Sequence, residues 1–99
     1  MGTAARRKPQ RLGEKLLEIR LGLGLSQNGL IRRMGFEDDL TQAQISMFER
    51  DIRQPSLLIL GAYARAVNIY VEALIYDDVD LPRRLPAGVK SEGTKRRRP

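Results

Sequence analysis

The sequence predicts an all-α domain, a compact bundle of about five helices. Apolar residues recur at intervals of three and four residues along most of the middle of the chain, which is the spacing of one face of an α-helix. Capping residues, glycines and prolines separate these periodic segments, as expected at helix ends. The 99-residue chain is long enough for one small helical domain without cross-links. The expected helices span residues 12–23, 26–34, 41–50, 56–67 and 71–75.

The first expected helix has an apolar stripe on one side and polar residues on the other. Gly22 and Gly24 weaken and end it, because glycine disfavours the helix interior. The stripe, at helical spacing, consists of Leu12, Leu16, Ile19 and Leu23. On the opposite, solvent-facing side we expect Glu14, Lys15, Glu18 and Arg20. This helix is therefore predicted to be scaffold.

Local signals define the ends of the next two helices. Ser26 is a candidate N-cap, since its hydroxyl can accept a hydrogen bond from an unpaired amide of the first turn. Gly35 ends that helix, because it adopts the left-handed conformation at little cost. Thr41 and Gln44 match the spacing of a capping box at the start of the following helix.

The helix over residues 41–50 has two distinct faces. Its inner face carries Ile45, Phe48 and Glu49. Its outer face carries Ala43, Ser46, Met47 and Arg50. Two short helices joined by a turn form the DNA-binding unit in which the second helix enters the major groove. Sequence-specific binding of double-stranded DNA is therefore the leading hypothesis for function.

The last two expected helices complete the core. Ser56, after Pro55, is the candidate cap of the helix over residues 56–67, and Asn68 suits a left-handed exit. The short helix over residues 71–75 should contribute Leu74 to the core. The apolar face expected on the longer helix consists of Leu57, Leu60, Ala64 and Val67, widened by Leu58 and Ile59.

Four short motifs carry a family resemblance, and they occur in order between residues 12 and 75. They are Leu25-Ser26-Gln27, Ile45-Ser46, Phe48-Glu49-Arg50 and Gln54-Pro55-Ser56. Together they resemble XRE-type helix-turn-helix proteins, the group of the phage Cro proteins and lambdoid repressors. The resemblance implies the lambda repressor-like five-helix fold, a small transcriptional regulator, and a phosphate contact by Gln27. It also implies a possible homodimer, formed through the last helix and residues 70–81.

The sequence departs from this family pattern at two places. Residues 36–39 lengthen the turn by about four residues, and we expect Phe36 to pack against the core there. The three acidic residues of this turn either favour the start of the next helix or repel phosphates and help to discriminate among sites. Asp51 stands where the family has Gly or Asn, so the helix either ends there with some strain or runs one residue longer.

The candidate DNA-contacting side chains lie mainly on the helix over residues 41–50. A glutamine amide in its first turn can pair bidentately with adenine, and Ala43 can contact a thymine methyl group. Arg50 can reach a guanine edge or a phosphate, and Arg53 a phosphate. The competing interpretation is an ordinary amphipathic helix with a solvated outer face. The candidate site is Gln27, Thr41, Gln42, Ala43, Gln44, Ser46, Met47, Arg50 and Arg53.

The net charge of +6 is concentrated at the two ends of the chain. Residues 1–11 carry +4 and residues 82–99 carry +6, whereas seven basic and eleven acidic residues leave residues 12–81 at −4. We therefore predict a disordered basic arm over residues 1–10, a helix-turn-helix domain over residues 11–81 and a disordered basic tail over residues 82–99. The two basic segments either contact phosphates or only increase solubility.

Composition argues against several other classes of protein. The chain contains no cysteine and no histidine, and no apolar run approaches the roughly 20 residues of a membrane span. We expect a cytoplasmic protein with no catalytic residue, no metal, no cofactor and no small-molecule substrate. The alternative function is a protein-interaction module of the antitoxin or bridging-factor type, in which exposed tyrosines supply the surface. The candidate tyrosines are Tyr63, Tyr70 and Tyr76.

Overall fold

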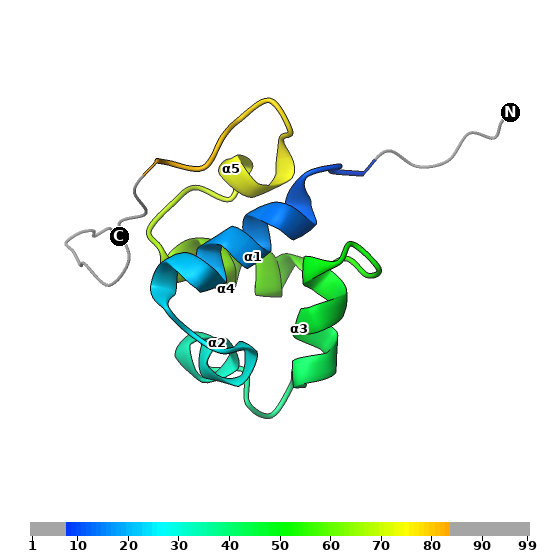
Figure 1. The fold of residues 1–99 in the computed structure, drawn as a ribbon, viewed down its shortest axis with the longest axis vertical. Coiled ribbons are helices and arrows are strands. Elements are labelled where there is room, and N and C mark those ends of the chain that lie inside the picture. The colour runs from blue at the N-terminus through cyan, green and yellow to red at the C-terminus, as the bar shows by residue number, and fades with distance from the viewer. Residues whose placement is uncertain (1–7, 84–99) are drawn as a thin grey trace, which may run out of the picture.

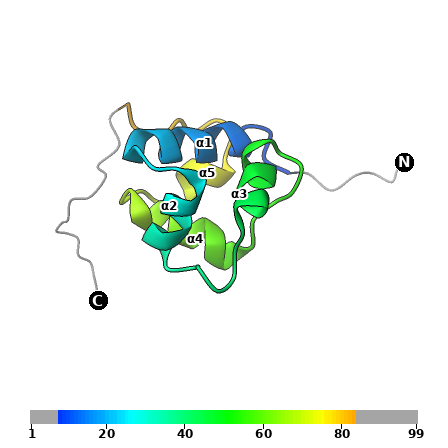
Figure 2. The ribbon, with the colours of Figure 1, turned by 60° about the horizontal axis from the view of Figure 1, so that its bottom comes forward.

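The computed structural model describes residues 8–83, and this part of the chain contains five helices and no strand (Figure 1). The helices are α1 (Leu12–Leu23), α2 (Gln27–Met34), α3 (Gln42–Glu49), α4 (Leu57–Ala66) and α5 (Glu72–Ile75). Helix α1 packs against α3 and α5, and α2 packs against α3 and α4. In Figure 1, α5 lies above α1, and α2 and α3 lie below it. Figure 2 shows α1 along the top of the bundle, with α2, α3 and α4 beneath it. The predicted all-α fold is confirmed.

The core consists of one apolar side chain or more from every helix. Leu16, Ile19, Leu30, Ile45 and Leu74 are completely buried. They come from α1, α2, α3 and α5, and α4 adds further buried residues described below. Burial of an aliphatic side chain contributes about 1.5–3 kcal/mol, so packing of the amphipathic faces stabilises these short helices.

Capping side chains set the helix starts as the sequence predicts. The Ser26 hydroxyl accepts a hydrogen bond from the Gly29 amide at 2.9 Å, and the Ser56 hydroxyl accepts one from the Ile59 amide at 3.3 Å. At the end of α2, Gly35 has a φ of +77°. Asn68, just after α4, also has a positive φ, of +58°, and this prediction is confirmed as well.

The apolar face predicted for α4 is confirmed at Leu60, Ala64 and Val67, and Ile59 packs against the core, but the face begins later than the sequence indicated. Leu57 is 86% exposed and Leu58 is 78% exposed, so neither belongs to the core. The buried stripe is Leu60, Tyr63, Ala64 and Val67. Of the predicted face, only Leu57 and Leu58, the first two residues of α4, face solvent. The expectation that Leu57 and Leu58 form part of the inner face is wrong, and Tyr63 is a core residue.

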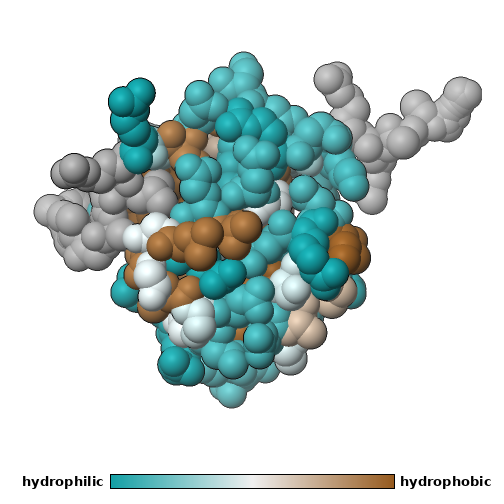
Figure 3. All heavy atoms as spheres, in the orientation of Figure 1, coloured by the Kyte–Doolittle hydropathy of each residue, from teal (hydrophilic) through white to brown (hydrophobic). Residues whose placement is uncertain are grey.

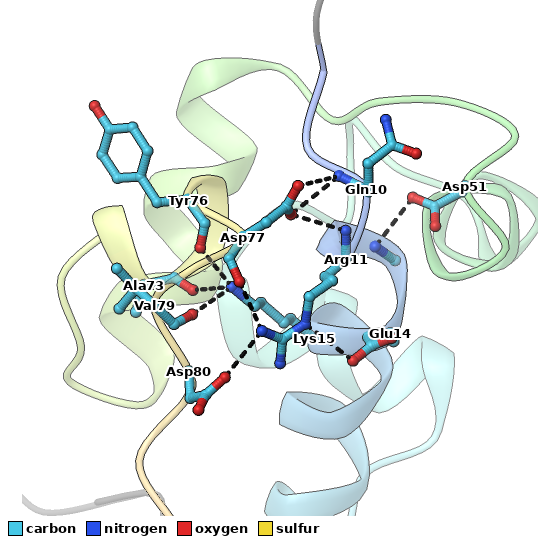
Figure 4. A network of polar contacts seen from close by, with 11 residues as sticks. Gln10, Arg11, Glu14, Lys15, Asp51, Ala73, Tyr76, Asp77, Val79 and Asp80 are labelled. Atoms are coloured by element: carbon cyan, nitrogen blue, oxygen red, sulfur yellow. Dashed lines mark hydrogen bonds and ion pairs between the residues drawn. The ribbon is translucent and has the colours of Figure 1, made fainter.

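Lys15 is a second correction, because it is completely buried rather than solvated. Its Nζ donates hydrogen bonds to the backbone oxygens of Ala73 at 2.8 Å, Tyr76 at 2.9 Å and Val79 at 2.6 Å (Figure 4). Burial, and secondarily Arg11, lowers the pKa of Lys15. Lys15 follows Leu12 by three residues and precedes Ile19 by four, so its backbone lies at the edge of the apolar stripe, and its three acceptors draw the side chain inward.

The C-terminal segment also caps the start of α1 (Figure 4). The Asp77 carboxylate accepts hydrogen bonds from the amides of Gln10 and Arg11, at 2.9–3.0 Å. Arg11 Nη1 donates in return to the Asp77 carbonyl at 2.7 Å and to Asp80 Oδ1 at 2.9 Å. Helix α1, which has no cap from its own N-terminal residue, is therefore capped by a residue distant in sequence. We call Arg11, Lys15, Asp77 and Asp80 the C-terminal clamp.

The predicted ends of the domain fall partly outside the described residues. Residues 1–7 of the expected arm and residues 84–99 of the expected tail are not described. The proposed limits of the domain, residues 11 and 81, stay predictions. Within the described part, Gln10 already hydrogen-bonds to Asp77, so contacts to the bundle begin before residue 11.

Candidate nucleic-acid interface

The lengthened turn before α3 is a compact loop anchored at both ends. Phe36 packs against the core and Leu40 is buried. The Phe36 carbonyl accepts hydrogen bonds from the amides of Asp39 and Leu40, both at 2.9 Å. Glu37, Asp38 and Asp39 are exposed. The expected packing of Phe36 is confirmed, and the loop delivers the chain to Thr41 in a fixed position.

The start of α3 is closed by the predicted capping box. The Thr41 hydroxyl accepts a hydrogen bond from the Gln44 amide at 3.3 Å, and Gln44 Oε1 accepts one from the Thr41 amide at 2.9 Å. The Thr41 hydroxyl also lies 3.3 Å from Gln44 Oε1. These contacts hold the first turn and leave the Gln44 side chain half-buried, bent back along the helix.

The outer face of α3 presents polar and small side chains to solvent. Gln42 and Ala43 are exposed in the first turn, and Arg50 is exposed at the end of the helix. Ser46 and Met47 are half-buried between them. Arg50 Nε donates to Ser46 Oγ at 3.1 Å, so Ser46 holds the guanidinium along this face. The two terminal NH2 groups of Arg50 are left to donate to a ligand.

The inner face of α3 is tied to two other helices by a polar cluster. Ile45 and Phe48 are buried, as predicted. Glu49 pairs bidentately with Arg20 of α1, at 2.6 and 3.1 Å, and Glu49 Oε1 also accepts a hydrogen bond from Gln27 Nε2 of α2 at 3.1 Å. The bond to Glu49 raises the pKa of the Arg20 guanidinium. Arg20 is therefore a structural residue and does not lie on a solvated face, which corrects that expectation.

Gln27 is half-buried at the start of α2, beside this cluster. Its bond to Glu49 uses one of the two hydrogens of the side-chain amide, so one N–H remains to donate. The amide is thereby oriented by α3. Contact between Gln27 and a DNA phosphate stays a prediction.

The end of α3 turns sharply at Asp51, which has a φ of +60°. Its carboxylate compensates by accepting a hydrogen bond from the Gly13 amide at 3.0 Å, at the start of α1. A Cβ on Gly13 would lie 2.7 Å from the Asp51 carboxylate and 2.8 Å from the Glu49 carbonyl, so only glycine allows this approach. The predicted strained exit at Asp51 is confirmed, and it fixes α3 against α1.

Charge is distributed unevenly along α3. The exposed acidic residues of the turn precede the helix, whereas Arg50 and Arg53 follow the last residues of its outer face. Arg53 is held in place by a hydrogen bond from its amide to the Met47 carbonyl at 3.4 Å. An extended anion is therefore attracted to the C-terminal end of α3 rather than to its start.

The surface that faces the viewer in Figure 1 is mostly hydrophilic, with a few hydrophobic patches, as Figure 3 shows. Leu21 of α1 is one of the large apolar residues that are exposed. In the described part of the chain, no helix is long and apolar enough to cross a membrane.

A five-helix bundle in which a short, capped helix presents an exposed polar face, braced by the preceding helix, is a helix-turn-helix domain. A family model described as helix-turn-helix matches residues 16–74, more than half of the chain. The chain belongs to the XRE, or lambda repressor-like, helix-turn-helix family, a family of DNA-binding regulatory domains. Searches of curated proteins and of solved structures found no significant match.

Proposed function

We propose that this protein is a sequence-specific regulator of transcription that inserts α3 into the major groove of double-stranded DNA. The observation that carries the proposal is the outer face of α3, where exposed Gln42, Ala43 and Arg50 lie on a helix fixed by its inner face. A rigidly held helix places its side chains against base edges with little loss of conformational entropy on binding.

Each candidate residue has a role that its position supports. Gln42 pairs with adenine, Ala43 contacts a thymine methyl group, and Arg50 contacts a guanine edge or a phosphate. Gln27, which hydrogen-bonds to Glu49, and Arg53, which follows α3, contact phosphates. The remaining candidates complete the groove-facing surface or support it: Thr41, Gln44, Ser46 and Met47.

The protein is further proposed to act as a homodimer through α5 and residues 70–81. Two exposed tyrosines support this location, since tyrosine is enriched at protein interfaces. They are Tyr70, which is 83% exposed, and Tyr76. Two copies would then present their α3 helices to successive major grooves, about 34 Å apart. Sedimentation of the free protein at increasing concentration measures the dimer directly, and a monomer at all concentrations would remove this part of the proposal.

A protein-interaction module is the second candidate function, and the exposed Leu57, Leu58 and Tyr70 favour it. Such a module uses the same fold to bind a partner protein instead of DNA. The cytoplasmic location expected from the sequence stays a prediction under either function.

Selection from a randomised duplex pool distinguishes the two functions. Wild-type protein is expected to enrich one motif at both low and high salt, because base contacts depend less on salt than phosphate contacts do. Gln42→Ala should weaken binding to that motif by about 1–3 kcal/mol with an unchanged melting temperature. Glu18→Ala, exposed on α1, is the control and should bind as wild type. If no motif is enriched, the interaction module becomes the better hypothesis.

A further inference from the structure

The two glutamines in the first turn of α3 differ in what their side chains have left to offer. Gln44 Oε1 accepts a hydrogen bond from the Thr41 amide at 2.9 Å. A backbone N–H can only donate, so the side-chain atom facing Thr41 must be the oxygen of Gln44 and not its nitrogen. The oxygen has two lone pairs, and the Thr41 hydroxyl donates to it as well, at 3.3 Å. The acceptor of Gln44 is thus engaged inside the protein, and only its NH2 group remains, with two donors.

Gln42 is in the opposite state. It is exposed, and within the described part of the chain its side-chain amide makes no hydrogen bond. It keeps both its acceptor and its donors. Only an amide in this state can form the bidentate pair with adenine, which needs a donor for N7 and an acceptor for the N6 amino group.

An NH2 group alone suits a different base edge. Guanine presents two adjacent acceptors, N7 and O6, in the major groove, whereas adenine presents one acceptor beside an amino group that would face the NH2 hydrogens. Turning the Gln44 amide outward would release its oxygen but remove the side-chain acceptor of the Thr41 amide at the helix start.

We propose that Gln44 is a donor-only specificity residue that selects guanine, unlike Gln42 of the same turn, which the proposed function already pairs with adenine. This inference rests on the proposed DNA-binding function and adds the base preference at one further position. It also makes Gln44 serve two purposes, since one atom of its amide caps α3 and the other contacts DNA.

Replacing each glutamine by glutamate separates these purposes. Glutamate is a natural residue at this position of a capping box, so Gln44→Glu keeps the acceptor for the Thr41 amide. It has no donor when ionised, so the guanine contact is lost. Gln44→Ala removes both and is the matched control for the cap.

The test is selection from a randomised duplex pool with the full-length wild type, Gln42→Glu and Gln44→Glu, together with thermal melting of all variants. Gln44→Glu should reduce the guanine preference at one position roughly two- to tenfold. Gln42→Glu should reduce the adenine preference at another position roughly tenfold. The melting temperature should be unchanged in Gln44→Glu and lowered in Gln44→Ala, because only alanine removes the cap.

Several outcomes would overturn the inference. A preference for adenine at the position that depends on Gln44 would show that the Gln44 oxygen is not reserved for the cap. If no position depends on Gln44, its NH2 group does not contact a base. An unchanged melting temperature in Gln44→Ala would show that the cap itself is not used. If the wild type enriches no sequence at all, the proposed function fails, and the inference fails with it. If the wild type enriches a motif that has adenine at the position dependent on Gln44, only the inference fails.

Discussion

The outer face of α3 and the C-terminal clamp use similar polar side chains in opposite ways. In the clamp, Lys15 donates to three backbone carbonyls and Asp77 accepts from two backbone amides. On α3, Gln42 and the terminal groups of Arg50 are exposed to solvent. A charged or polar residue in the sequence therefore does not by itself indicate a ligand-binding site. What distinguishes the two regions is whether the hydrogen-bonding groups are already satisfied within the protein.

Replacing Lys15 by methionine should have the largest effect on the clamp. Methionine has a similar length, so the change removes the ammonium group and leaves the carbonyls of Ala73 and Val79 without their side-chain donor, while the Tyr76 carbonyl keeps only the Val79 amide. The free energy of unfolding should fall by about 3 kcal/mol. For a domain of this size, the melting temperature should fall by on the order of 15 °C.

Thermal melting of Lys15→Met beside Glu18→Gln measures this effect, since Glu18 is an exposed residue of the same helix. A melting temperature equal to that of the wild type would show that water replaces the Lys15 ammonium group as hydrogen-bond donor to these carbonyls without loss of stability. The contrast between the two regions would then lose its main support.

Asp77→Asn should have a smaller, pH-dependent effect. Hydrogen bonds from the backbone amides of Gln10 and Arg11 lower the pKa of Asp77 below its usual 3.8. The folded state therefore favours the ionised carboxylate, which stabilises the fold above about pH 4, and this stabilisation is lost as the pH falls through the lowered pKa.

Urea unfolding at several pH values measures this contribution. The wild type should be more stable than Asp77→Asn at about pH 7, and the two curves should converge at acidic pH, below the lowered pKa of Asp77. Asp78→Asn, an exposed neighbour, should follow the wild type throughout. A constant difference between wild type and Asp77→Asn at every pH would mean that the ionised form is not what the amides bind.

Ser46→Ala should have the smallest effect on stability, and it tests the outer face of α3 rather than the C-terminal clamp. It removes the acceptor that holds Arg50 Nε, while the fold loses no buried contact. The melting temperature should stay the same, and affinity for the selected duplex should fall roughly threefold, because Arg50 must then be ordered on binding. Fluorescence anisotropy of the labelled duplex measures the affinity, with Arg50→Ala as the reference variant. If Ser46→Ala weakens binding as much as Arg50→Ala, Ser46 contacts DNA itself.

The features that the sequence predicted correctly depend on neighbouring residues. The caps at Ser26, Thr41 and Ser56 and the helix end at Gly35 each involve residues within four positions, so local spacing is sufficient. The outer and inner faces of α3 follow from helical periodicity in the same way. Family resemblance then supplied the arrangement of the helices in space, which periodicity alone does not give.

The features that the sequence did not predict depend on distant partners. The charge of Lys15 predicts a solvent-exposed side chain, but its three acceptors are 58, 61 and 64 residues away. The apolar side chain of Leu57 predicts a core position, but Leu57 is the first residue of α4 and is 86% exposed. Likewise, the Arg20 pairing depends on where α3 lies against α1. In each case tertiary position overrode residue type.

The long sequence separation of the clamp has a kinetic consequence. Its bonds close loops of more than fifty residues, and the helices between them must already be arranged before the acceptors lie within reach of Lys15. The clamp should therefore form late, after the rate-limiting step of folding. Interactions absent from the transition state slow unfolding and leave the folding rate almost unchanged. We therefore expect the clamp to govern how long each molecule stays folded, rather than how quickly it folds.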